Sequence, residues 1–302
     1  MGDQGAARLS LKKSLSHLCH RLEQTQVVRR HLQSIFRAVE ESKQTFLTAD
    51  RLKELNIEVS SLELEAAGTA KFYQPCPENE LVVIKWDEVE LWRWDEGRAE
   101  EPARVDHNLF KVWHQIWAYK FLNDLKIDWE YCDNHPVTGR AEYPPRHPYQ
   151  WIAHNESNST SFKPHFAMQV MHDAEPEEQL SRGEILPITA YMGFRLKDYQ
   201  YVQHYYMPIL VFSIFRSQAR ILQAYHDGTY LHISKSGFYD FKEDNRTNYE
   251  LFVRWLCCKP CGETRIPLHV QGEGLDERTV KELRSYLKKA LNIGIAKKSA
   301  DS

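Results

Sequence analysis

Residues 208–236, "PILVFSIFRSQARILQAYHDGTYLHISKS", decide the fold. Three runs rich in β-branched and aromatic residues, at 209–215, 219–225 and 230–236, predict three consecutive strands. The Asp227-Gly228 pair supplies the positive φ that a tight primed hairpin turn needs between the last two strands. This stretch therefore predicts antiparallel strands within a sheet.

Helical patterns flank these strands. Pro187 suits the first turn of a helix, and apolar residues over 188–202 stay roughly on one face. The segments 242–257 and 274–294 also have amphipathic spacing, and Asp276 is positioned to cap the second of them. Helices therefore precede and follow the predicted strands.

Further upstream, residues 105–127 predict an amphipathic helix with a wide aromatic face. Two short β-prone runs, 81–86 and 89–94, indicate a hairpin, and the proline-rich residues 130–165 indicate a long irregular loop. A loop of that length is the first place to expect a lid over a substrate. We therefore expect an α+β core domain over residues 71–302, with a mixed sheet and flanking helices.

Residues 1–70 are expected to form a helical arm. Within residues 8–45 the apolar positions repeat at 4-3-4 spacing in two groups, Leu11, Leu15, Leu18 and Leu22, then Val28, Leu32, Ile35 and Val39. The arm either forms a coiled coil that makes a homo-oligomer or packs on its own domain, and we favour the second. Thr48 or Asp50 then caps a second helix, which we expect to run to Gly68.

Composition limits the class of protein. Eight Trp, fifteen Tyr and thirteen Phe indicate a folded chain, and 39 Lys+Arg against 42 Asp+Glu give no general attraction to nucleic acid or to an anionic membrane. No stretch has the ~20 apolar residues that span a bilayer, and the N-terminus lacks the apolar core of a signal peptide. We expect a cytoplasmic protein, with a nuclear location left open, whose six cysteines stay reduced.

Three cysteines crowd residues 257–261, where Cys258-Lys259-Pro260-Cys261 spells C-x-x-C. A redox C-x-x-C lies at the N-terminus of a helix, where the helix dipole lowers the pKa of the thiol. Here the motif follows a helical pattern, and Pro260 and Gly262 stop the helix. We therefore interpret the motif as a helix end that carries thiols.

One zinc site stays open as an alternative. Cys132 and His135 have C-x-x-H spacing, and together with Cys258 and Cys261 they would make a Cys₃His set of the kind that structural zinc uses. The site requires the fold to bring together segments about 120 residues apart. We otherwise predict no cofactor.

Acidic residues precede the proline-rich loop in "DWEYCDNH", residues 128–135. Asp128, Glu130 and Asp133 are residue types that bind Mg²⁺ or act as general acids and bases, and His165 is a fourth catalytic candidate. No defined spacing selects them. The motifs HExxH, GxSxG, GxGxxG and GxxxxGK[ST] are absent from the sequence, so no reaction is indicated.

The order of helix, apolar strand and hairpin over residues 160–265 resembles the C-terminal half of the restriction-endonuclease-like PD-(D/E)xK core. The part at 186–241, with "YELFVRWLCCKPCGETR" (residues 249–265) after it, is similar to a family of uncharacterised filamentous-fungal proteins, some encoded near specialised-metabolite gene clusters. Pro164-His165 stands where the nuclease motif has Pro-Asp, and no E-x-K follows on the next strand. The resemblance therefore implies the fold without the nuclease reaction.

These observations favour an accessory or binding protein over an enzyme, in fungal specialised metabolism. Its partner would be another protein or a small molecule, with no membrane and no nucleic acid. Two alternatives remain: a metal-dependent enzyme on a degenerate nuclease-like core, and a structural protein that oligomerises through residues 8–45.

Overall fold

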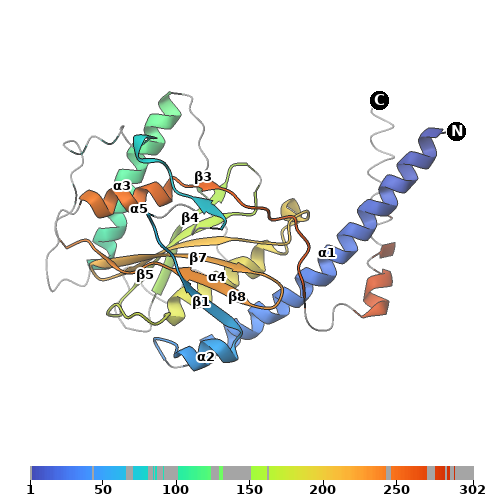
Figure 1. The fold of residues 1–302 in the computed structure, drawn as a ribbon, viewed down its shortest axis with the longest axis horizontal. Helices are drawn as coiled ribbons and strands as arrows, with labels where there is room; N and C mark the ends of the chain where they lie inside the picture. The colour runs from blue at the N-terminus through green and yellow to red at the C-terminus, as the bar shows by residue number, and fades with distance from the viewer. Residues whose placement is uncertain are drawn as a thin grey trace.

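A computed structural model gives the fold of the 302-residue chain (Figure 1). The residues it describes are 2–42, 44–65, 71–80, 84, 86, 91, 101–123, 129–131, 151–161, 163–242, 246–270, 276–282, 284, 285 and 289. The described elements combine helices with a mixed sheet, so the chain is an α+β protein as predicted.

One mixed sheet lies at the centre of the molecule, in the strand order β1-β8-β7-β6-β5-β4-β3 (Figure 1). Its strands are β1 (Ile57–Ser61), β3 (Trp129–Tyr131), β4 (Trp151–Ser159), β5 (Phe166–His172), β6 (Ile209–Phe215), β7 (Gln218–His226), β8 (Leu231–Lys235) and β9 (Tyr239–Asp240), which pairs with the start of β7. Neighbours are antiparallel except β5 with β6 and β1 with β8, which are parallel. The three strands expected at 209–236 are thus confirmed as β6, β7 and β8.

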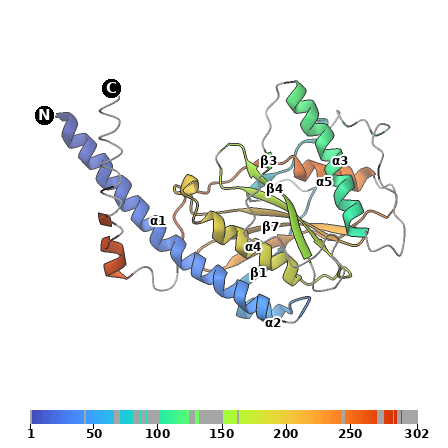
Figure 2. The ribbon, with the colours of Figure 1, turned by 180° about the vertical axis from the view of Figure 1, so that it is seen from behind.

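Helices cover both faces of this sheet (Figures 1 and 2). α1 (Gly2–Glu41) and α4 (Arg182–Arg195) pack on one face, and α3 (Glu101–Leu122) and α5 (Arg246–Leu256) pack on the other. Shorter elements are α2 (Ala49–Glu54), the 3-10 turns η1 (Glu78–Glu80) and η3 (Tyr199–Tyr201), and the paired strands β2 (Tyr73–Gln74) and β10 (Lys259–Pro260). Each face of the sheet therefore has its own apolar core.

The second half of the α1 stripe belongs to the core of its own domain. Val28, Leu32, Ile35 and Val39 are each at most 1% exposed, and they pack with α4 and with the sheet residues beneath it. The interpretation of this half as a helix packed on its own domain is confirmed. The side chains of Leu11 and Leu15 lie outside the described residues.

The second helix of the arm is shorter than predicted. Thr48 caps α2, and its side-chain oxygen accepts a hydrogen bond from the Arg51 backbone N–H. The helix ends at Glu54, Asn56 takes a positive φ of 51°, and residues 57–61 form β1 beside β8. The prediction of a helix to Gly68 was wrong, because pairing with a distant strand outweighs local helix propensity here.

The β7–β8 turn and the start of α4 differ in detail from expectation. Gly228 has the positive φ expected of it, at 111°, but Asp227 does not share it; its carboxylate instead accepts hydrogen bonds from the Thr229 and Tyr230 backbone N–H groups. Pro187 lies inside α4 and not in its first turn, because the helix begins five residues earlier, after its N-cap, Ser181. Both elements exist as predicted, with shifted boundaries.

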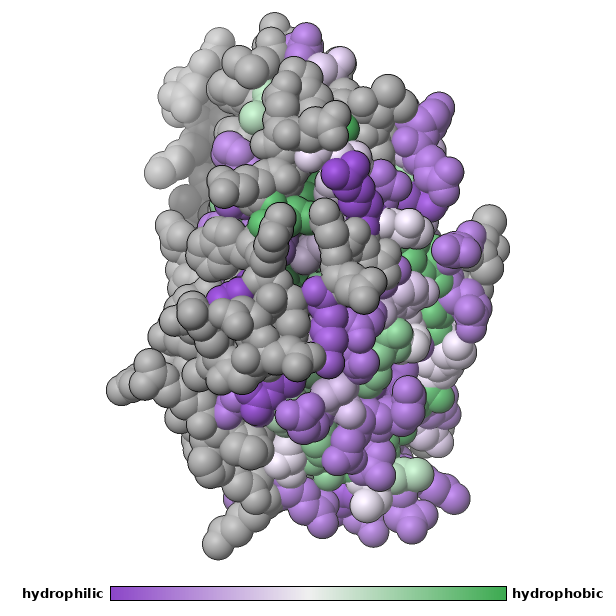
Figure 3. Space-filling view, turned by 90° about the vertical axis from the view of Figure 1, so that its left-hand side faces the viewer, coloured by the Kyte–Doolittle hydropathy of each residue, from purple (hydrophilic) through white to green (hydrophobic). Residues whose placement is uncertain are grey.

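The proline-rich region is more regular than predicted. Residues 151–159 form β4, which pairs with β5 along most of its length, so the expectation of irregular structure throughout 130–165 was wrong in part. Residues 132–150, and most of the hairpin predicted at 81–94, lie outside the described residues. On the face drawn in Figure 3, the described surface is mainly hydrophilic, and the hydrophobic areas are small and separate.

Candidate functional site

The structure describes two of the four predicted catalytic residues. Glu130 is exposed on β3, and His165 is fully buried just before β5. Asp128 and Asp133 lie outside the described residues. Across the part of the chain that the structure describes, no group of three or more His, Cys, Asp or Glu side chains is arranged to hold a metal ion.

The C-x-x-C motif follows the end of a helix, as predicted. α5 ends at Leu256, and Lys259 and Pro260 then pair with β2. The Cys258 side chain is fully buried, and burial raises the pKa of the Cys261 thiol, so the thiolate form is disfavoured there. This geometry supports a structural role for residues 257–261, which form a corner between α5 and β10, and gives no support to a redox centre.

His165 anchors this corner to the sheet. Its Nε2–H donates to the Cys261 carbonyl oxygen at 2.8 Å, because a carbonyl can only accept. Burial, together with the nearby charges of Lys163 and Arg195, lowers the pKa of His165 to about 4. The ring is therefore neutral near pH 7 and does not act as a general acid there.

The segment that precedes the other predicted zinc ligands lies against this corner. The Trp129 indole Nε1–H donates to the Cys258 carbonyl oxygen at 2.7 Å. Cys132 and His135 themselves lie outside the described residues. The four-residue zinc site therefore stays a prediction.

A partly buried ion pair that the sequence did not indicate joins α3 to β4, and its His154 side chain is 23% exposed. His154 Nε2 lies 2.9 Å from Asp106 Oδ1, and the Asp106 side chain is 5% exposed. Burial disfavours the charged imidazole, but the carboxylate of Asp106 outweighs burial and raises the pKa of His154. Asp106 opens an amphipathic helix and His154 lies in a polar run, so neither local pattern identifies the pair.

The stabilising effect of this ion pair should depend on pH. Because folding raises the pKa of His154 above 6.5, its contribution is complete below pH 6.5 and is lost as the pH rises through the raised value. We expect the difference in unfolding free energy between wild type and His154→Gln to shrink from pH 6 toward pH 9, as measured by urea denaturation. The exposed His20→Gln is the control, and a difference that grows with pH for His154→Gln would contradict the assignment.

A cavity between α3, α5 and the sheet is too small for a substrate. It measures about 20 Å³ and is lined by Phe110, Trp113, Trp129, Ser157, Ala167, Met168, Gln169, Phe212 and Leu256. That volume holds about one water molecule. Asp106 and His154 do not line this cavity, and their ion pair links α3 to β4.

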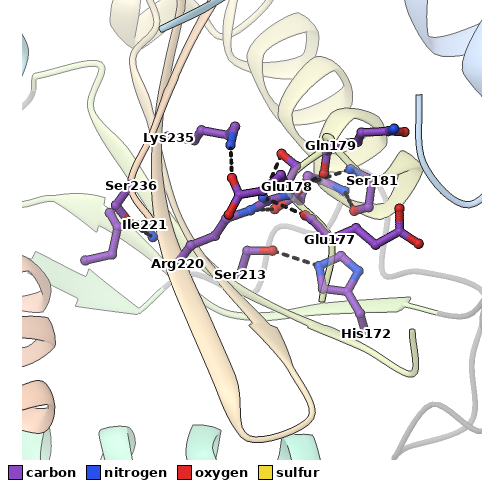
Figure 4. A network of polar contacts seen from close by, with 11 residues as sticks. His172, Glu177, Glu178, Gln179, Ser181, Ser213, Arg220, Ile221, Lys235 and Ser236 are labelled. Atoms are coloured by element: carbon purple, nitrogen blue, oxygen red, sulfur yellow. Dashed lines mark hydrogen bonds and ion pairs between the residues drawn. The ribbon is translucent and has the colours of Figure 1, made fainter. Parts of the chain in front are cut away.

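A second ion pair, fully buried, lies at the start of α4 (Figure 4). Arg220 of β7 donates from Nε and Nη2 to the two carboxylate oxygens of Glu184, at 2.7 and 2.6 Å, and both side chains are 0% exposed. Arg220 also donates to the backbone carbonyls of Glu177, Glu178 and Gln179. The Arg220 and Glu184 side chains have no exposed surface, and the network holds the β5–α4 connection on the sheet.

A pocket of ligand size lies between α1, the α2–β1 turn and the β7–β8 turn. Its volume is about 450 Å³, within the ~300–1,000 Å³ range of small-molecule sites. It is lined by Val27, Arg30, His31, Ser34, Asn56, Gly228 and Thr229. The sequence analysis singled out only Gly228 among them, as a turn residue, because the lining comes from three segments that are distant along the chain.

A chain of hydrogen bonds between neutral histidines joins the walls of this pocket. His226 Nδ1 accepts from the Gly228 backbone N–H, so its proton is on Nε2, which donates to His31 Nδ1 at 2.8 Å. His31 Nε2–H then donates to the Leu55 carbonyl oxygen at 3.1 Å. Burial lowers the pKa of His226 to about 3 and also lowers the pKa of His31, so both rings are neutral at physiological pH.

Residues 268–269 are hydrogen-bonded both to α1 and to the β7–β8 turn. The Gln24 side chain exchanges two hydrogen bonds with the Leu268 backbone, at 2.6 and 2.9 Å. The Thr229 hydroxyl donates to the next carbonyl, that of His269, at 3.2 Å. The β7–β8 turn, α1 and residues 268–269 are therefore held together as one frame.

Comparison with known proteins adds no family to this description. No protein-family model, no curated protein and no solved structure matches the chain. Among the described residues, no helix is both long and apolar enough to cross a membrane. The function has to be argued from the pocket and the polar contacts around it.

Proposed function

We propose that the chain is a binding protein that holds a small molecule in the pocket between α1 and the β7–β8 turn. The observation that carries this proposal is an open pocket of about 450 Å³ whose walls are hydrogen-bonded to one another. Ligand pockets are usually formed before the ligand binds, since ordering a loose wall would reduce affinity. The histidine chain fulfils that condition, because it links α1, the β7–β8 turn and the α2–β1 turn.

A binding role agrees with the features of the other polar sites. The Glu184–Arg220 pair is sealed from solvent, and the cavity between α3, α5 and the sheet holds about one water molecule. Neither has room for a substrate. An accessory role in fungal specialised metabolism is the context that the sequence resemblance suggests, and it stays a proposal.

The alternatives from the sequence have weaker support. A metal-dependent enzyme would need ligands beyond those that the described residues bring together. An oligomer through residues 8–45 would have to form without the second half of the apolar stripe, because residues 28–39 of that stripe are already buried in their own domain. We therefore place ligand binding first.

Filling the pocket should abolish binding. Ser34 is exposed on α1 and lines the pocket, so Ser34→Trp places an indole ring in the ligand volume while the helix is retained. We expect fragments that show saturation-transfer NMR signals with wild type to bind at least about tenfold more weakly to this variant, a loss of about 1.4 kcal/mol. Gln33→Trp is the matched control, because Gln33 is exposed on the same helix and does not line the pocket.

The two variants separate the outcomes. Fragments that bind wild type and Gln33→Trp, but not Ser34→Trp, would support the pocket as the binding site. Fragments that bind all three proteins equally would show that they occupy another surface, and the proposal would then be abandoned. Circular dichroism on each variant checks that α1 is still folded.

A further inference from the structure

β1 is an edge strand whose outer side is open in the part of the chain that the structure describes. It ends the sheet order, and β8 is its one strand neighbour there (Figure 1). All residues of β1 after Ile57 are exposed, and Val59 at its centre is a large apolar side chain with 39% of its surface exposed. An exposed edge strand is a template on which another strand can pair.

The backbone of β1 divides its hydrogen-bonding groups between two sides. The Leu231 N–H donates to the Asn56 carbonyl oxygen at 3.0 Å, and the Leu62 N–H donates to the Lys235 carbonyl oxygen at 2.8 Å. The N–H and C=O groups of one residue in a strand point to the same side, and the side alternates along the strand. Residues 56, 58, 60 and 62 therefore face β8, and residues 57, 59 and 61 direct these groups away from it.

The usual protections of an edge strand are missing from β1. Natural edges are commonly blunted by proline, by lysine or by a β-bulge. The sequence of β1 is IEVSS, which contains neither residue, and its register with β8 runs without a bulge. Its one charged side chain, Glu58, lies 3.2 Å from His232 Nδ1 of the neighbouring strand. The outer side of β1 is therefore suited to pairing.

The sequence of β1 fits a second copy of itself. In an antiparallel pair centred on Val59, this residue faces Val59 of the second copy, and Ile57 faces Ser61. Each outward N–H and C=O group of these residues then has a partner. Glu58 faces Ser60, whose hydroxyl can donate to a carboxylate, and the two exposed Val59 side chains meet on one face.

Hydrogen bonding and charge select this register over slipped ones. A slip by one residue would set the outward groups of one strand against groups that are already bonded to β8. A slip by two residues in one direction would place Glu58 opposite Glu58 of the second copy, and like charges directly opposite are destabilising. A slip by two in the other direction would shorten the paired ladder. The register centred on Val59 pairs the whole strand.

We propose that two copies of the chain associate through β1, antiparallel and centred on Val59, so that their sheets join across a twofold axis. Both copies use the same strand, so the contact is isologous and closes with two members. The association leaves α1 in the core of its own domain, and so it differs from an assembly through residues 8–45. It is also independent of whether the pocket beside α1 binds a ligand.

The mass in solution tests the association. Light scattering and sedimentation equilibrium on the full chain should approach twice the 35.6 kDa of one copy as the concentration rises to about 100 µM, since one short strand makes a small interface. A mass of 35.6 kDa at that concentration would overturn the proposal. The edge would then be open to an extended segment of another protein.

Opposite charges at position 59 test the register. Val59→Lys and Val59→Glu each place two like charges directly opposite one another, so each variant alone should be monomeric. Mixed in equal amounts, they bring a lysine opposite a glutamate, and the dimer mass should return. Tyr119→Lys is the matched control, because Tyr119 is 44% exposed on α3 and should leave the dimer intact.

This rescue requires that position 59 of one copy meets position 59 of the other. Circular dichroism on each variant checks that it is folded. If a folded variant alone keeps the dimer mass, the copies meet through another surface and the proposal fails. A mixture of the two folded variants that stays monomeric would likewise contradict the register.

Amide exchange in the wild-type chain gives a readout that needs no substitution. The N–H groups of Ile57, Val59 and Ser61 should exchange about tenfold more slowly once about nine in ten copies are paired, because they exchange only from the monomer. The N–H groups of Glu58 and Ser60 face β8 in either state and should change much less. Unchanged exchange at residues 57, 59 and 61 in a dimeric sample would place the contact elsewhere and overturn the proposal.

Discussion

Replacing Arg220 with methionine is expected to lower the free energy of unfolding by about 3–5 kcal/mol, the usual cost of removing one partner from a buried ion pair. The variant would leave the Glu184 carboxylate uncompensated beneath α4, where neither side chain has any exposed surface. It would also remove the donors to the carbonyls of Glu177, Glu178 and Gln179. Urea denaturation followed by circular dichroism measures the loss, with the exposed Lys53→Met as control.

The pH dependence of this loss has a definite sign. Burial opposes ionisation of Glu184, but Arg220 outweighs burial and lowers the pKa of the carboxyl below its usual 4.5. The contribution of the pair is therefore present above pH 4.5 and is lost as the pH falls through the lowered pKa. The difference between wild type and Arg220→Met should shrink in that acidic range, and a loss below about 1 kcal/mol at pH 7 would show that the pair is not structural.

Arg220→Lys separates charge from geometry. A lysine keeps the positive charge but cannot reproduce the two parallel hydrogen bonds to Glu184 or reach the loop carbonyls with the same fork of donors. We expect an unfolding free energy between those of wild type and Arg220→Met. A lysine variant as stable as wild type would show that charge alone is sufficient here.

Part of this network could be predicted from the sequence. Ser181-Arg182-Gly183-Glu184 has the S-x-x-E spacing of a capping box, and the structure contains both of its reciprocal hydrogen bonds. That spacing predicts a helix that starts at residue 182, whereas the position of Pro187 indicated a start at 187. The partnership with Arg220, 36 residues along the chain, depends on the pairing of β5, β6 and β7 and has no local signature.

The same distinction applies to the fold and to the candidate pocket. The strands at 209–236 were predictable because each run carries its own β propensity and Asp227-Gly228 marks the turn between two of them. β1 was not, because its five residues, mostly exposed, follow a helix and form a strand only by pairing with β8. The pocket depends on that pairing, since it places Asn56 beside the β7–β8 turn and opposite α1.

Replacing Ile35 with alanine is the second change with a large expected effect, about 2–5 kcal/mol of unfolding free energy. Ile35 is 0% exposed and lies in the cluster that joins α1 to α4 and the sheet, so its truncation leaves a cavity in the main core. Gln33→Ala, two residues away and exposed on the same helix, should change stability by less than about 0.5 kcal/mol.

The comparison of Ile35→Ala with Gln33→Ala also tests whether α1 serves for assembly or for the stability of its own domain. If the helix were an arm that serves mainly for assembly, Ile35→Ala would lower the oligomer mass in light scattering and leave the unfolding free energy of the domain nearly unchanged. Because its second half is part of the core, we expect the opposite: lower stability at unchanged mass. Deleting residues 8–45 would then unfold the domain, since it would remove core residues from 28 to 39 together with the α1 wall of the pocket.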